Sequence, residues 1–315
     1  MYIFFCTFAA LLSNYMNEIV EYIIQFLVYG DEHAAKQVGY TADESQWGKY
    51  RVVIVPSGHL GKEIVVPELD RCAVDRVTGD KEMRHATWII RTDIVYNTFF
   101  FISRAEELIN HQRDEHGRFL AKHSILGQNN RLMIPTVDEY ARMLMKLLDM
   151  PMPTPLFSHI YLTHDVDTIE QYRHWRGALG GILRGKVREV LASLKDIHND
   201  PAFTFSWLIS QDKKVEGAKC IYFVKDTLGK GYDYPQYELF GKDFETVKDM
   251  IEQSGAEIGL HSSYYGHEST PSEVYGRLLI QQNEQPEKPI CHRSHYLNCS
   301  IDQMQRWAKI GITDD

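Results

Sequence analysis

The stretch His159-Ile-Tyr-Leu-Thr-His-Asp-Val-Asp167 begins as an alternating apolar segment and ends in two aspartates. We predict a β-strand over residues 159–163 that runs directly into the acidic pair. Residues i and i+2 of an extended segment point the same way, so Asp165 and Asp167 are expected to face one cavity. One such carboxylate can bind a metal ion while the other acts as a base. A helix cap or a turn, where aspartate is also common, is the alternative for the same residues.

The chain after this stretch alternates between strand-like and helix-like segments. We expect strands over 220–224, 256–260 and 289–291, with a further strand beginning near 310, and helices over 186–197, 243–253 and 301–309. Strands that alternate with helices predict βα units and a parallel sheet. In such folds the active site lies at the carboxyl ends of the strands.

Two more polar clusters follow predicted strands. His261 comes at the end of 256–260, and His292-Arg-Ser-His-Tyr296 follows 289–291. Imidazole together with carboxylate suits zinc and similar divalent ions, and arginine can orient a carboxylate through paired hydrogen bonds. The alternatives are a structural histidine and a surface ion pair.

A proline-rich segment divides the chain. Pro151, Pro153 and Pro155 can neither continue a helix nor enter a central strand, so residues 151–157 are predicted to link two domains. The first, residues 1–150, is expected to be a smaller α/β domain with helices over 17–28 and 136–149 and a buried strand over 51–55. Residues 94–101 are expected to be strand, or strand followed by helix.

Bulk properties limit the partners. The 315 residues carry a net charge of -9 without a dense cluster of lysine and arginine, which does not favour nucleic acid or an anionic membrane as partner. The apolar run over residues 2–12 is too short to span a membrane and lacks the basic residues of a signal peptide. The five scattered cysteines indicate a reduced, cytoplasmic protein, while the apolar N-terminus leaves a secreted or periplasmic location, or a true start at Met16, open.

The order of three motifs resembles the polysaccharide-deacetylase family (NodB-type, carbohydrate esterase family 4). Thr163 to Asp167 is similar to its acidic motif, Gly259-Leu-His-Ser262 to its histidine motif, and Arg293-Ser-His-Tyr296 to its arginine–aromatic motif. The resemblance implies a partial, distorted (β/α) barrel over residues 158–315. The whole chain also resembles a two-domain type known from Bacteroidetes, through residues 92–97 and 131–145.

The resemblance also implies roles for individual residues. Asp165 would be the catalytic base, steadied by Arg293, and Asp167 and His261 would bind a divalent metal, zinc or else cobalt or nickel. The implied reaction removes acetyl groups from an N- or O-acetylated carbohydrate. Aromatic residues near the motifs, Tyr264, Tyr265 and Tyr296, are candidates to stack against the sugar, with core packing as their alternative.

The chain departs from the family's pattern in two places. The family's second histidine lies four residues after the first, where this chain has Tyr265, so the third ligand is expected to be His267, His164, His295 or a water. A catalytically inactive carbohydrate-binding or scaffold protein is therefore the alternative function. The chain also ends at Asp315 as a strand begins, before the family's later motifs, so we expect a C-terminally truncated barrel.

Overall fold

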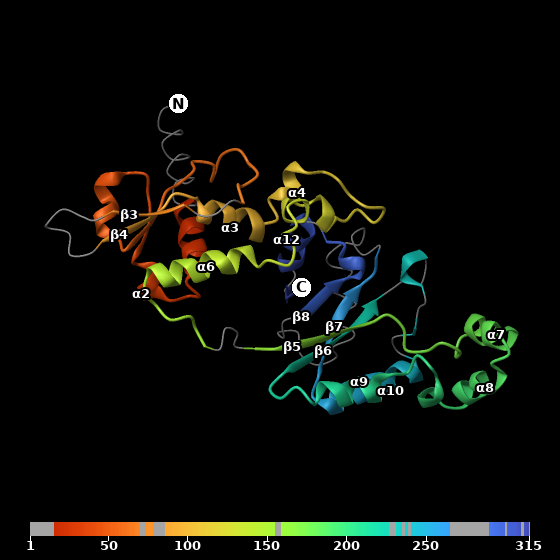
Figure 1. Ribbon diagram of the computed structural model, residues 1–315. Coiled ribbons are helices and arrows are strands. Elements are labelled where there is room, and N and C mark those ends of the chain that lie inside the picture. The colour runs from red at the N-terminus through yellow and green to blue at the C-terminus, as the bar shows by residue number, and fades with distance from the viewer. Residues whose placement is uncertain are drawn as a thin grey trace. The chain divides into compact units, whose positions relative to one another are not determined.

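The computed structural model describes residues 16–69, 73–77, 86–154, 159–226, 231–234, 237–238, 241–264, 290–299, 301–309 and 312–314. The chain divides into two compact units, Met1–Leu156 and Phe157–Asp315, and the division lies within the proline-containing segment. Each unit contains one sheet with helices, which makes the protein mixed α/β (Figure 1).

The first unit has a four-stranded sheet in the order β1-β2-β4-β3, in which only the edge strand β3 runs antiparallel. Its strands are β1 (Val38–Tyr40), β2 (Val52–Ile54), β3 (Val74–Val77) and β4 (Thr87–Ile90). Its helices cover residues 16–27, α2 (Glu32–Ala35), α3 (Ile94–Ile102), α4 (Glu106–Ile109), α5 (Ile125–Gln128) and α6 (Thr136–Leu147), with 3₁₀ turns η1 (Glu44–Lys49) and η2 (Ala121–His123).

Both faces of this sheet are covered by apolar side chains. Val52, Ile54 and Ile90 pack with the helix over 16–27 and with α3 and α6 in the larger core. Val53 and Ile89 point to the other face, where they pack against Trp47. Burial on both faces explains why these strands are continuous apolar runs rather than alternating ones.

The second unit has a five-stranded parallel sheet in the sequential order β5-β6-β7-β8-β9, curled into a half-barrel. Its strands are β5 (Tyr161–Val166), β6 (Lys219–Asp226), β7 (Glu257–Ser262), β8 (Ile290–Ser294) and β9 (Ile312–Asp314). Its helices are α7 (Trp175–Leu183), α8 (Val187–Lys195), α9 (Phe205–Asp212), α10 (Lys242–Ser254) and α12 (Ile301–Lys309), with 3₁₀ turns η3 (Ile197–Asn199), η4 (Gly231–Asp233) and η6 (His295–Leu297).

The two faces of the curled sheet differ in character. Tyr222 and Val224 of β6 pack in a core with Phe205 of α9 and with Val247 and Ile251 of α10. The opposite face carries Asp165 on β5, which pairs with Phe223 on β6. It also carries His261 on β7, which pairs with Arg293 on β8. The helices therefore close one face and leave the other for polar side chains.

Several boundaries differ from those predicted. β5 continues to Val166, so Asp165 lies within the strand, and β8 continues to Ser294. Residues 94–102 form helix α3 because Asp93 caps it, its carboxylate accepting a hydrogen bond from the Tyr96 N–H at 2.9 Å. Helices α7 and α9 were missed.

Candidate metal centre

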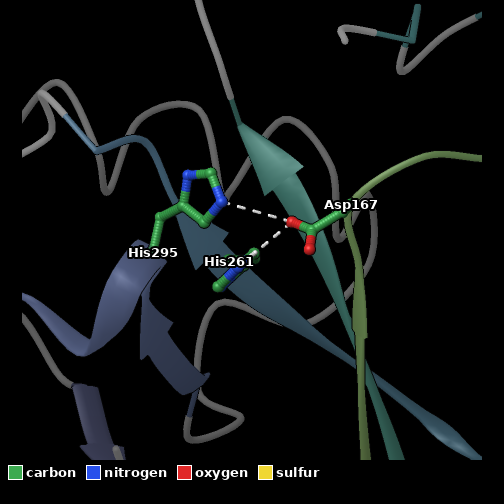
Figure 2. A group of neighbouring side chains, drawn as sticks. All are labelled: Asp167, His261 and His295. Carbon is green, nitrogen blue, oxygen red and sulfur yellow. Dashed lines mark ion pairs between the residues drawn. The ribbon is translucent and has the colours of Figure 1, made fainter. Parts of the chain in front are cut away.

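Asp167, His261 and His295 form a cluster at the carboxyl ends of the strands in the second unit (Figure 2). Asp167 directly follows β5, His261 lies in β7, and His295 opens the 3₁₀ turn after β8. One donor atom from each residue lies within 4.8 Å of the other two. Parallel strands bring these residues together because their carboxyl ends meet at one edge.

The spacing of the donor atoms suits a small divalent ion. Asp167 Oδ1 lies 3.6 Å from His261 Nε2 and 3.3 Å from His295 Nε2. Ligand atoms at the usual distances in a tetrahedral zinc site lie roughly 3.3–3.6 Å from one another. Two imidazoles and one carboxylate are also a donor set that zinc and its neighbours accept. The residues therefore fit a metal.

Both histidines are held by hydrogen bonds at Nδ1, on the side of the ring away from the cluster. His261 Nδ1 donates to the Arg293 carbonyl at 2.9 Å, and His295 Nδ1 lies 2.9 Å from Asp233 Oδ1. Such second contacts fix the tautomer and direct Nε2 toward a metal. Both Nε2 atoms face the Asp167 carboxylate, as Figure 2 shows.

Asp233, which no sequence motif indicated, anchors this arrangement. Its side chain is fully buried, and it accepts hydrogen bonds from the Tyr264 N–H at 2.7 Å and from the Ser263 hydroxyl. Burial alone would raise the pKa of Asp233, but the hydrogen bonds from His295, Ser263 and Tyr264 outweigh it and keep the pKa low. It lies in a loop-like stretch of sequence, which gave no signal for a buried carboxylate.

The electrostatics of the cluster distinguish its two histidines. Burial penalises the cationic form of His261 and lowers its pKa. Burial also opposes the charge on His295, but hydrogen bonds with Asp167 and Asp233 raise its pKa to about 9. The hydrogen bond with His295 in turn lowers the pKa of Asp167. His261 is therefore neutral and ready to bind a metal, whereas a metal must displace a proton from His295.

Asp165 and Arg293 form a second group on the same face of the sheet. Arg293 Nη1 donates to Asp165 Oδ1 at 3.0 Å and to Thr163 Oγ1 at 3.1 Å, so the arginine reaches from β8 across to β5. Its guanidinium passes over the Phe223 ring, 4.5 Å from the ring centre. A side chain at Gly259, on the intervening strand β7, would come within 2.6 Å of Phe223. The glycine at position 259 therefore leaves room for the Phe223 ring over which the Arg293 side chain passes.

The other predicted ligands have different fates. His295 joins the cluster. His164 does not, because adjacent residues of a strand point to opposite faces. Its Nε2 lies 2.9 Å from Asp212 Oδ1, on the helix-covered face, and its ring centre lies 4.6 Å from that of Tyr222. His267, like Tyr265, lies outside the described residues.

Three tyrosines gather beside the cluster. The rings of Tyr232 and Tyr264 are 4.6 Å apart, and the Tyr296 ring lies 5.6 Å and 5.3 Å from them. Tyr296 also contacts the His295 ring at 4.8 Å and has a left-handed backbone with φ of 60°. Tyr264 and Tyr296 are among the aromatic residues that the sequence offered as candidates to stack against a sugar. Left-handed backbone is uncommon in a bulky residue.

Comparison with known proteins informs only the first unit. Residues 9–153 match a family of unknown function, DUF7033. The matched segment is less than half of the chain and ends close to the boundary between the two units. No curated protein and no solved structure matches the chain. Among the described residues, no helix is long and apolar enough to cross a lipid bilayer.

Proposed function

We propose that the second unit is a metal-dependent hydrolase of the polysaccharide-deacetylase (NodB) type that removes acetyl groups from an N- or O-acetylated carbohydrate. The observation that carries this proposal is the pairing of the Asp167–His261–His295 cluster with the Asp165–Arg293 ion pair on one face of a curled parallel sheet. His295 supplies the imidazole that the sequence lacks at position 265.

In this proposal Asp167, His261 and His295 hold a divalent ion, with zinc preferred over cobalt or nickel. A bound divalent ion polarises an acyl carbonyl and lowers the pKa of water. The buried histidines are fixed by their contacts with Arg293 and Asp233, so the ligands need little rearrangement.

Asp165 is the proposed general base. It lies two residues before Asp167, close enough to serve the same reacting atoms, and its side chain is partly exposed. Arg293 donates a hydrogen bond to one carboxylate oxygen of Asp165 and so fixes its orientation, which makes it a positioning residue for the base. Thr163, bonded to the same guanidinium nitrogen, extends this support along β5.

The tyrosine cluster is the proposed sugar-binding surface. Pyranose rings present apolar faces that stack on aromatic rings, and Tyr232, Tyr264 and Tyr296 form such a surface next to His295. A cluster adjacent to the metal ligands would place the acetyl group of a bound sugar at the reacting centre. Tyr232 is 45% exposed and is the member most accessible to a ligand.

The test compares Asp165→Asn with the wild type for acetate release from N-acetylglucosamine oligomers and from acetylated xylan, with bound metal measured by elemental analysis. We expect Asp165→Asn to lose turnover by about 10²–10⁴-fold and to keep its metal, because the base is removed while the ligands stay. Asp249→Asn, an exposed aspartate on α10, is the matched control and should change neither quantity.

Two outcomes would contradict the proposal. Undiminished turnover in Asp165→Asn would remove this residue from the mechanism. A wild-type protein that binds metal and sugar but releases no acetate from either polymer would instead be the carbohydrate-binding alternative.

A further inference from the structure

Helices α7 and α8 and the residues that join them, residues 174–195, form a helical hairpin at the side of the second unit, beyond α9 and α10 (Figure 1). The inner side of the hairpin is built from small residues. Gly181 is buried, and a Cβ there would come within 2.5 Å of Val190 and 3.0 Å of Tyr172. Gly181 therefore faces inward, and the exposed large side chains of α7 lie on its outer side.

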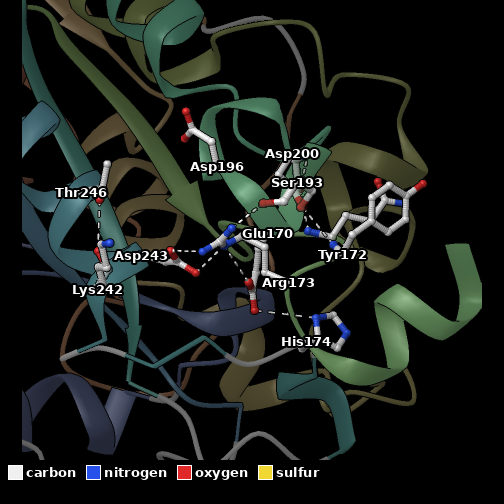
Figure 3. A network of polar contacts seen from close by, with 12 residues as sticks. Glu170, Tyr172, Arg173, His174, Ser193, Asp196, Asp200, Lys242, Asp243 and Thr246 are labelled. Carbon is white, nitrogen blue, oxygen red and sulfur yellow. Dashed lines mark hydrogen bonds and ion pairs between the residues drawn. The ribbon is translucent and has the colours of Figure 1, made fainter. Parts of the chain in front are cut away.

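Polar contacts fasten the base of the hairpin (Figure 3). Arg173 donates to both carboxylate oxygens of Asp243 on α10 and to the Ser193 carbonyl on α8. Asp200 accepts hydrogen bonds from the Ser193 hydroxyl and from the Tyr172 N–H. These contacts tie α8 and the start of α7 to the body of the unit. These hydrogen bonds hold the inner side of the hairpin against the unit, so the large side chains on the other side face outward.

The outer sides of both helices are apolar and exposed. Seven large apolar side chains in the hairpin are exposed: Trp175, Leu179, Ile182, Leu183, Val187, Leu191 and Leu194. On α7 they follow the spacing i, i+4, i+7 and i+8, and on α8 the spacing i, i+4 and i+7, so each helix has one continuous apolar stripe. Trp175 is 71% exposed and Leu183 is 78% exposed. Contiguous exposed apolar surface of this kind marks a site of interaction.

The hairpin also differs from the rest of the chain in charge. Residues 174–195 contain five basic side chains and one acidic one, a net charge of +4, whereas the whole chain carries -9 and the remaining residues therefore carry -13. On α8, Arg188 and Lys195 lie along one edge of the apolar stripe, and Glu189 lies on the far side of the helix. The net charge of the whole chain is negative, and it therefore gave no sign of this local excess of basic residues.

We infer that the hairpin docks on the surface of an anionic lipid bilayer. Helices with an apolar face of tryptophan and leucine, flanked by lysine and arginine, lie in the membrane interface and bind through buried apolar area together with attraction to anionic headgroups. Each helix has nine residues, far too short to cross a bilayer, so the hairpin lies on the surface. This inference is independent of the proposed function.

Two features favour lipid over other partners. Leucine, isoleucine and valine make up most of the stripes, and these side chains do not stack on nucleic-acid bases. A symmetric dimer through this face would place one +4 hairpin against another, which like-charge repulsion opposes.

The test is co-sedimentation of the full chain with vesicles of phosphatidylcholine containing about one-third phosphatidylglycerol, compared with pure phosphatidylcholine. We expect binding to the anionic vesicles at least about tenfold tighter than to neutral ones, weakened by salt. The apolar variant Leu179→Gln/Leu183→Gln/Leu191→Gln and the charge variant Arg184→Glu/Arg188→Glu should each weaken it by about tenfold or more.

Matched controls change similar residues elsewhere. For the apolar variant the control is Leu108→Gln/Leu132→Gln/Met133→Gln, three exposed apolar side chains of the first unit, and for the charge variant it is Lys213→Glu/Lys214→Glu at the end of α9. Both controls should bind vesicles like the wild type. The proposal is overturned if the wild type stays in solution with anionic vesicles at low salt, or if the apolar variant binds as tightly as the wild type. Equal binding to soluble polyglutamate, unaffected by the apolar variant, would also overturn it, because the partner would then be an acidic polymer.

Discussion

Asp93 and Asp167 occupy similar places in the two units, each just after a strand of a parallel pair, yet their surroundings differ. Asp93 follows β4 in the first unit, and Asp167 follows β5 in the second. Asp93 is buried, whereas the Asp167 side chain is 57% exposed. The comparison shows what makes a strand-end aspartate a candidate ligand.

Hydrogen bonds within the fold occupy Asp93. Its carboxylate accepts from the Tyr40 hydroxyl at 2.9 Å, from both the N–H and the hydroxyl of Ser57 at 2.8 Å, and from the Tyr96 N–H. A cavity of about 470 Å³ borders it, with His59 among the lining residues. Although it borders a cavity, the Asp93 carboxylate accepts its hydrogen bonds from groups of the protein itself.

Asp167 faces two imidazole nitrogens instead. Its Oδ1 is the atom nearest to both His261 Nε2 and His295 Nε2, and no regular helix begins at it. An aspartate at a strand end is therefore a candidate ligand only where its lone pairs converge with those of other donors. Three predictions, from the largest expected effect to the smallest, test this difference.

Alanine substitution at the two aspartates should have opposite consequences. Asp167→Ala should lose stoichiometric metal, measured by elemental analysis after zinc loading, and in the absence of metal should unfold at nearly the wild-type midpoint because the side chain is exposed. Asp93→Ala should retain metal and lose about 2–4 kcal/mol of unfolding free energy, because the buried N–H of Tyr96 and the partly buried hydroxyl of Tyr40 lose their acceptor.

Thermal and denaturant unfolding followed by circular dichroism provide the stability measurement. Leu132→Ala, an exposed side chain of the first unit, is a control that should change neither metal content nor stability. If Asp167→Ala keeps its metal, the cluster is not a metal site.

The second prediction compares two histidine–aspartate pairs. Asp233→Asn should weaken zinc affinity by about 10–100-fold, because it removes the charge that orients His295. Asp212→Asn changes an equivalent partner, that of His164 on the opposite face, and should leave the affinity unchanged. Competition with a chromophoric chelator measures both, and equal affinities for the two variants would refute the supporting role of Asp233.

The third prediction concerns Glu170, a partly buried carboxyl beside Arg173 and His174. Burial and the nearby charge of Asp243 raise its pKa from 4.5 to about 7, although Arg173 opposes the shift. The folded state thus holds this proton more tightly than the unfolded state, so its contribution to stability is complete below pH 4.5 and is lost as the pH rises toward 7.

Glu170→Gln stays neutral and should therefore lose less stability than the wild type between pH 4.5 and 7.5. We expect the unfolding midpoint of Glu170→Gln to fall over this range by roughly 2–4 °C less than that of the wild type. Differential scanning calorimetry at a series of pH values measures both midpoints. The exposed Glu216→Gln is the control and should follow the wild-type curve. An unchanged slope in Glu170→Gln would show that this carboxyl does not titrate in that window.

Local patterns predicted much of the second unit correctly. Apolar runs located β5, β6, β7 and β8, and helical spacing located α8, α10 and α12, because buried strands and amphipathic helices impose short-range periodicity on a sequence. The polar residues after the strands also selected Asp165, Asp167, His261 and Arg293 for one face, because parallel strands share a carboxyl edge.

Glycine-rich α7 was missed because Gly177, Gly180 and Gly181 disfavour helix in isolation, although Gly181 is used here for close packing against Val190 and Tyr172.

Other features depended on contacts between residues far apart in the chain. His295 rather than His164 faces Asp167, because strand parity turns His164 toward Asp212, a residue 48 positions away. Asp233 reaches His295 across 62 positions. Sequence alone determined which residue types end each strand and that the strands are parallel. Only the tertiary structure decided which of those side chains converge, because convergence depends on the curl of the sheet and on which face each residue points to.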